Sequence, residues 1–332
     1  MNRMKLEEQE DLTLIPLTTP LQIDKDLTLL PRIKLNLTIH PSNPSSLTSS
    51  SIDQFQLKNS LLTFLQTSKT LPFPLPEEDL IFKRFHKDPK KRKRDEPLVY
   101  GTLHIWNLTF LQSKNDVVET RNRLVEKMNG IEMNLLGVKF RLEVSVSDCD
   151  DFEFMKKGWE EFYAFGNGNG NRKREPDTIV IRGVPSRWFA ETRVSSKPSM
   201  LVTHTIFEKF GKIRNLNVAE DDYSAKDANE DSGDLVSGLY CKIVVQFEKY
   251  KDFHDALRVL CGRSLQKQGS RLKADYEVTW DKDGFFRNSR NQPQEKNNAV
   301  IAADHYRSEA PRRQVYNSRH SPDRVRPRRF KE

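Results

Sequence analysis

Six segments in the C-terminal half of the chain alternate between two hydrophobic patterns, and their order limits the possible folds more than any other feature. Thr178–Pro185 is a β-branched run closed by Gly and Pro, which predicts a strand. Apolar residues at helical spacing follow from Leu201 to Phe210 and stop at Gly211, which predicts a helix. The remaining segments are strand patterns at 213–218, 239–247 and 273–280 and a second helical pattern at 253–260.

The order strand, helix, strand, strand, helix, strand predicts two helices on one face of a four-stranded sheet, with the other face open to a ligand. This is the order of an RNA recognition motif, where bases stack on aromatic side chains of the two central strands at about 1–3 kcal/mol per base. In this chain the usual aromatic positions hold Val180, Lys242 and Val244. Because side chains alternate along a strand, these three are expected to share the open face, which is therefore aliphatic with one cation.

The missing aromatics leave two interpretations open. Either the fold is kept without base stacking, or the stacking platform is displaced onto other side chains. The candidates for RNA contact outside the usual positions are Arg182, Trp188, Phe189, Tyr276 and Trp280. Trp188 and Phe189 are equally compatible with packing beneath the loop after the first strand.

Two stretches of this region carry a resemblance to a known family. PDTIVIRGVPSRWFA at 176–190 and IFEKFGKIRNLNV at 206–218 resemble the RNA recognition motif of the A-kinase anchor protein 17A-like family. The resemblance implies residence in the nucleus and its speckles, a part in splice-site choice, and single-stranded RNA, pre-mRNA and splicing proteins as partners. It also implies docking of protein kinase A regulatory subunits by amphipathic helices beyond the motif. We do not expect that docking here, because the residues after Gly284 have few apolar residues at helical spacing.

The first half of the chain repeats the same order of elements. Strand patterns at 32–40, 80–86, 98–108 and 138–146 enclose helical patterns at 55–65 and 117–128. We therefore expect an α+β fold of two ferredoxin-like βαββαβ sandwiches with disordered termini. In the first of them Lys34 occupies the usual aromatic position of the first strand, and Tyr100 is the only evident candidate for base stacking. We therefore expect this domain to act as a scaffold rather than to bind RNA. The expected divisions are a flexible N-terminus (1–28), a degenerate RNA recognition motif-like domain (29–149), a short helix and basic linker (150–177), the RNA recognition motif (178–283) and a disordered Arg-rich tail (284–332).

Basic clusters lie outside the predicted elements. The first interrupts the first domain, and as a short exposed run it favours a nuclear import signal over merely solvated charge; its residues are Lys90, Lys91, Arg92, Lys93 and Arg94. The second lies in the linker and either contacts RNA backbone or keeps the linker solvated; its residues are Arg172, Lys173 and Arg174. In the tail, Ser321 precedes a proline and is a phosphorylation candidate that would add negative charge beside arginines. The acidic loop at 220–234 lacks EF-hand spacing and is expected to be disordered.

Composition narrows the function class. The net charge of +8 and a pI near 9.2 favour polyanionic partners. The three cysteines have neither metal nor redox spacing, and the sequence shows no signal peptide, membrane span, phosphate-binding loop or catalytic constellation. We therefore expect no enzyme activity, no cofactor and no metal. Two functions stay open: an RNA-binding splicing protein that uses the second sheet, linker and tail, or a protein-binding scaffold of splicing complexes whose sheet does not bind RNA.

Overall fold

The structure is a computed structural model of residues 1–332. It describes residues 16, 18–42, 53–84, 97–111, 114–135, 137–165, 175–191, 194–221, 239–269 and 271–288.

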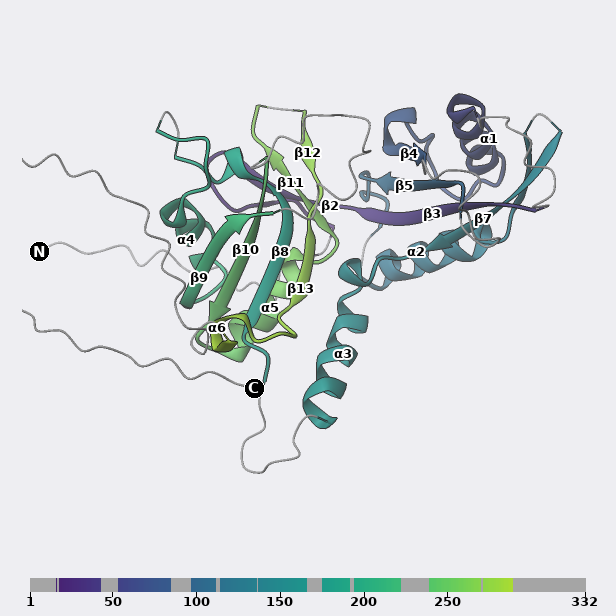
Figure 1. The fold of residues 1–332 in the computed structure, drawn as a ribbon. Coiled ribbons are helices and arrows are strands. Elements are labelled where there is room, and N and C mark those ends of the chain that lie inside the picture. The colour runs from purple at the N-terminus through teal and green to yellow at the C-terminus, as the bar shows by residue number, and fades with distance from the viewer. Residues whose placement is uncertain are drawn as a thin grey trace, which may run out of the picture. The chain divides into compact units, whose positions relative to one another are not determined.

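The first module is a five-stranded antiparallel sheet in the order β4-β5-β3-β7-β6, with two helices (Figure 1). Its elements are β3 (Ile33–Pro41), α1 (Gln54–Thr67), β4 (Leu80–Arg84), β5 (Val99–Ile105), α2 (Lys114–Met128), β6 (Glu132–Leu135) and β7 (Val138–Ser145). Helix α1 begins at Asp53, whose side chain accepts a hydrogen bond from the backbone N–H of Phe55 at 3.0 Å.

Burial in this module alternates along the strands. In β3, Leu35 and Leu37 are fully buried, whereas Asn36 between them is half-buried. The buried side joins Leu57 and Leu61 of α1 and Leu124 of α2 in one core. Since side chains alternate across a strand, both helices cover one face and the other face carries mostly polar residues.

The second module is a four-stranded antiparallel sheet in the order β13-β8-β10-β9. Its elements are β8 (Thr178–Pro185), η6 (Ser186–Trp188), α4 (Met200–Glu208), β9 (Ile213–Glu220), β10 (Tyr240–Phe247), α5 (Tyr250–Leu260) and β13 (Glu277–Trp280). Ile179 and Ile243 face Phe207 of α4 and Leu257 of α5 in its core. The two modules confirm the predicted α+β class of paired ferredoxin-like sandwiches.

A third sheet joins the beginning of the chain to the second module, and here the expected divisions need correction. Strands β1 (Leu21–Gln22) and β2 (Leu27–Pro31) continue the hairpin of β11 (Arg263–Lys267) and β12 (Lys273–Ala274), so that Leu29 lies opposite Leu265 (Figure 1). Residues 21–28, expected in a flexible N-terminus, and 29–31, expected in the first domain, therefore belong to the second module. The physical reason is pairing: the hairpin offers an edge strand, and β2 supplies buried Leu27 and Leu29 to the same core.

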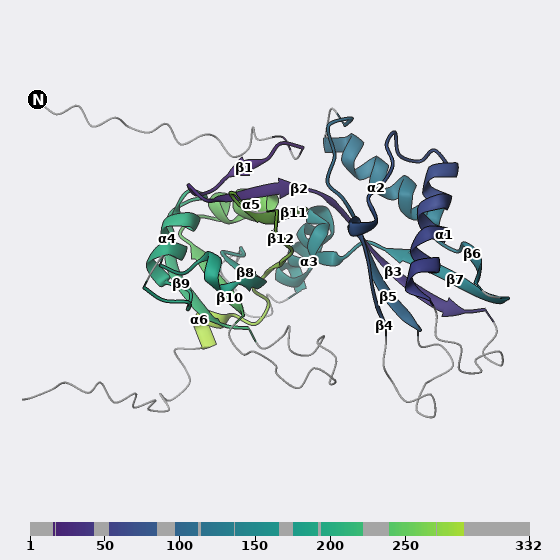
Figure 2. The ribbon, with the colours of Figure 1, turned by 90° about the horizontal axis from the view of Figure 1, so that it is seen from above.

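Two further segments surround the second module. After η5 (Asp148–Asp150), helix α3 (Phe152–Phe165) contributes Trp159 to the core, where its ring lies 5.6 Å from that of Phe253. Helix α6 (Phe285–Asn288) follows β13, and Figure 2 shows it on the side of the sheet opposite α5. Within the described ranges, no helix combines the length and apolar content needed to cross a bilayer.

Candidate nucleic-acid interface

The outer face of the second sheet is built from alternate residues of β8 and β10. Val180 lies directly opposite Val244, and neither belongs to the core beneath α4 and α5. Lys242 lies on the same strand as Val244, two residues before it, and is half-buried between fully buried Cys241 and Ile243. The register thus places the three residues predicted to replace the stacking aromatics on one face.

This face is not open at the valines, which corrects the prediction. Val180 is 7% exposed and Val244 is 2% exposed. The chain after β13 returns to this side of the sheet, where the Lys242 ammonium group lies 5.4 Å from the centre of the Phe285 ring. Asp281 fixes this return, because its carboxylate accepts a hydrogen bond from the Phe285 N–H at 2.7 Å. The valines are buried because the folded protein is more stable when apolar side chains on a sheet are removed from water.

One edge of the face is a polar network centred on a carboxylate. The side-chain amide of buried Gln246 donates to Asp177 at 2.9 Å and its oxygen accepts from Asn215. Asp177 also lies 3.9 Å from Arg214 and 4.0 Å from Arg287 of α6. These arginines are therefore partly neutralised, and Arg287 ties α6 to the sheet.

The prediction of a displaced stacking platform is wrong for three of the four aromatic side chains that it named. Tyr276 is 5% exposed and its hydroxyl donates to the Leu260 carbonyl at 2.7 Å, and burial raises the pKa of this phenol. Trp280 is 4% exposed and packs edge-on against Phe162. Phe189 is 1% exposed in the core beside α4. A buried ring has no face for a base, so these side chains are structural.

The remaining sequence-predicted residues divide into two groups. Trp188 is half-buried against the core, and Arg182 is half-buried opposite Glu277 of β13. The other group lies outside the described residues: the basic clusters at 90–94 and 172–174, Ser321, the acidic loop beyond Asp221, and the tail beyond Asn288.

Sequence reasoning missed a buried charge cluster where the chain passes from β2 to β3. The guanidinium of Arg32 lies 3.0 Å from Asp150 and 3.2 Å from Asp275, and the second carboxylate also contacts His104 at 2.7 Å and Lys34 at 3.1 Å. Burial alone would raise the pKa of Asp275, but His104, Arg32 and Lys34 outweigh it and hold that pKa well below its usual value. Burial likewise opposes the charge on Arg32, yet Asp150 and Asp275 leave the pKa of Arg32 raised.

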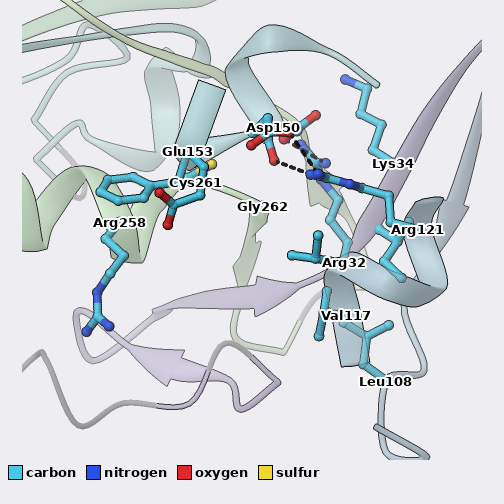
Figure 3. A pocket seen from close by; sticks show the side chains of 14 residues that line it. Arg32, Lys34, Leu108, Val117, Arg121, Asp150, Glu153, Arg258, Cys261 and Gly262 are labelled. Carbon is cyan, nitrogen blue, oxygen red and sulfur yellow. Dashed lines mark hydrogen bonds and ion pairs between the residues drawn. The ribbon is translucent and has the colours of Figure 1, made fainter. Parts of the chain in front are cut away.

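A shallow pocket adjoins this cluster, with Arg32, Arg121, Asp150 and Cys261 in its lining (Figure 3). Its charges are compensated within the protein, since Arg121 lies 2.8 Å from Asp151. Burial raises the pKa of the Cys261 thiol, so this cysteine is a poor nucleophile. Among the described residues there is also no group of three or more His, Cys, Asp or Glu side chains that could hold a metal ion. We therefore assign the cluster a structural role.

Comparison with known proteins adds an independent observation about the second module. A family model described as "AKAP-17A-like, RNA-binding domain" matches residues 113–318, which include all of β8 to α6 but not β3, β4 and β5. The human protein A-kinase anchor protein 17A is 30% identical over 154 residues, which are 44% of this chain. The matched part is 22% of that protein, so the chain covers about a fifth of its relative.

Proposed function

The chain belongs to the AKAP-17A-like RNA-binding domain family, and from this membership we propose that it is a non-enzymatic RNA-binding protein of pre-mRNA splicing that influences splice-site choice. The observation that carries the proposal is the fold of the matched segment, a β13-β8-β10-β9 sheet with α4 and α5 on one side. Its partners in this proposal are single-stranded RNA, pre-mRNA and other splicing proteins, and its place is the nucleus.

The mode of binding follows from the composition of the outer face. At the positions where rings usually stack, the two central strands present valines and Lys242, so base stacking at these positions contributes little. Cations around the face supply the affinity instead, by neutralising phosphates and releasing counterions. Lys242 and Arg182 come from the sheet itself. Lys212, just before β9, and Arg214 in β9 add positive charge that Glu248 and Asp177 partly neutralise.

The alternative function, a protein scaffold, depended on an apolar surface on the sheet or at the Trp188–Phe189 corner. Val180 and Val244 are covered, and Phe189 is in the core. No described observation therefore favours this alternative over RNA binding. Kinase anchoring is part of the name of the relative and is not proposed for this chain.

Anisotropy of labelled single-stranded RNA with the full chain tests the proposal. We expect log affinity to fall linearly with log salt at a slope of about −0.7 per phosphate contact. Lys242→Ala and Arg182→Ala are expected to weaken binding, whereas Lys251→Ala, which removes an exposed cation from α5 on the opposite side, is the matched control. Absence of RNA binding at low salt, or equal loss with all three variants, would contradict the proposal.

A splicing reporter with two competing sites then tests the proposed role in cells. Raised levels of the wild-type chain should shift the ratio of the two products, and the Lys242→Ala, Arg182→Ala double variant should shift it less. If the chain is nuclear and binds RNA but the product ratio does not change, the role in splice-site choice is refuted and the RNA-binding proposal is unaffected.

Nuclear import is proposed to depend on Lys90–Arg94. This run is contained between Arg84, where β4 ends, and Val99, where β5 begins, so its removal leaves both strands intact. Replacing these residues by a Gly/Ser segment of equal length in a tagged chain should abolish nuclear accumulation. The same replacement of residues 222–226 is the control, and unchanged accumulation in the first variant would overturn the assignment.

A further inference from the structure

We propose that the outer face of the first module's sheet is a second binding surface for single-stranded RNA, centred on Tyr100. This goes beyond the proposed function, which rests on the second module. The residues that form this surface on β3, β4 and β5 lie outside the segment 113–318 matched by the family.

Tyr100 lies on this face near the beginning of β5. This strand is one of the three inner strands of the order β4-β5-β3-β7-β6, and Tyr100 lies opposite Thr38 of β3 on one side and Lys83 of β4 on the other. Its side chain is 42% exposed. Aromatic rings exposed on the inner strands of such a sheet are the surfaces on which bases stack.

The neighbours of Tyr100 fit a nucleotide better than an apolar protein surface. Ile81, 45% exposed, lies opposite Thr102, which places it diagonally beside Tyr100 at roughly 7–8 Å. The other neighbours are short polar residues: Thr38, Thr102 and Asn36. One ring and one aliphatic side chain within a polar surface give room to a base but too little apolar area for a stable protein interface.

Exposed cations flank the ring on both sides, and they supply the charge complementarity for a polyanion. Lys83 lies directly beside Tyr100, and Arg141 and Lys139 are exposed on β7. Two carboxylates lie on the same face: Glu143, 3.5 Å from His40, and Glu132, opposite Arg141 on β6. The surface thus combines a stacking ring with cations on two strands, as expected for a site that follows an RNA backbone.

The exposed cations of this face argue against the chain's own Arg-rich tail as its occupant, because like charges repel.

The test is anisotropy of a labelled single-stranded RNA with the full chain. Tyr100→Ala is expected to weaken binding about tenfold, Tyr100→Phe to retain it, and the Lys83→Ala, Arg141→Ala double variant to weaken it and lower the salt slope. Phe55→Ala is the matched control, because Phe55 is an exposed ring (61%) on α1, on the helix-covered side of the same module.

The outcomes separate this inference from the proposed function. RNA binding that is unaffected by Tyr100→Ala and by the double variant, but weakened by Lys242→Ala, overturns the inference and leaves the second module as the binding site. If Tyr100→Ala and Phe55→Ala weaken binding equally, the effect is structural and the inference is also overturned. A change in sedimentation of the RNA-free chain with Tyr100→Ala would identify the surface as a self-association interface instead.

Discussion

The two sheets of this protein share the order of four strands, to which the first sheet adds β6, but their outer faces carry different side chains. In the second module Val180 and Val244 face away from the helices and are buried, with α6 on their side of the sheet. In the first module the corresponding face carries Thr38, Tyr100 and Lys83 in one row and remains exposed at Tyr100 and Lys83. The comparison shows that the side chains on a sheet face decide whether it is available to a ligand. Apolar side chains stabilise the fold when they are buried, whereas polar side chains can remain in contact with water.

The family match also treats the two modules differently. It includes every strand of the second module's β13-β8-β10-β9 sheet, where valines and Lys242 take the usual stacking positions and the exposed ring of Tyr240 lies at the start of β10. Of the first module it includes α2, β6 and β7, so Tyr100 lies outside it. If both modules bind RNA, we expect stacking on Tyr100 in the first and mainly charge around Lys242 in the second.

The largest effect is expected at Arg32, where the chain passes from β2 of the second module to β3 of the first. Arg32→Ala removes a fully buried cation and leaves Asp150 and Asp275 without their partner, so we expect a loss of about 3–5 kcal/mol in the free energy of unfolding. Arg123→Ala, which breaks the exposed pair with Glu119, is the control and should cost under about 0.5 kcal/mol. Denaturant unfolding measures both, and equal small losses would show that the two modules do not depend on this cluster.

Acid should weaken the same cluster through Asp275. Its pKa is lowered in the folded protein, so its contribution is fully present above the unfolded pKa of about 3.9 and is lost as pH falls toward the folded pKa. Asp275→Asn should therefore cost about 1.5–3 kcal/mol at pH 7, and this difference from wild type should shrink between about pH 4 and pH 2. Denaturant unfolding across that range is the measurement. A difference that stays constant with pH would mean that the carboxylate charge is not what stabilises the site.

Much of this architecture was accessible from the sequence, because it depends on local patterns. The alternation in β8 and β10 placed Val180, Val244 and Lys242 on one face, and the order of elements gave both sandwiches. The burial of Trp280 was not predictable in this way, because it depends on the register that pairs Trp280 with Ile179, a residue on the helix side of the sheet.

The rest depends on contacts between residues far apart in the chain. Nothing in the sequence around Leu29 indicates that it pairs with Leu265, and nothing near Arg32 indicates that its partners are Asp150 and Asp275. The position of α6 on the outer side of the second sheet could not be predicted for another reason. Helix α6 has only four residues, which is too short for a helical pattern to be recognised.

A direct test of the comparison exchanges a hydroxyl and a methyl group on the two faces. Val244→Thr places a hydroxyl on the buried face and should lower the free energy of unfolding by about 1–3 kcal/mol. The buried hydroxyl loses its hydrogen bonds to water, and the site did not evolve a partner for it. Thr102→Val makes the reverse change on the first module's half-exposed face and should stay within about 0.5 kcal/mol of wild type. Thermal and denaturant unfolding measure both variants. Equal costs would mean that the two faces are equally solvated and that the contrast between the sheets is wrong.

The smallest expected effect gives the sharpest comparison of the two sheets, because it measures how much a single lysine on each sheet contributes to RNA binding. Lys83→Ala on the first sheet and Lys242→Ala on the second should each lower the magnitude of the salt slope for single-stranded RNA by about 0.7 if each lysine contacts one phosphate. The sheets differ in what surrounds the lysine: Lys83 is exposed beside Tyr100, whereas Lys242 is half-buried beside the Phe285 ring. A strand that reaches Lys242 must therefore pass α6, and Phe285→Ala should increase the contribution of Lys242 while leaving that of Lys83 unchanged. If Phe285→Ala changes neither slope, α6 does not restrict access, and the two sheets differ in composition but not in their availability to RNA.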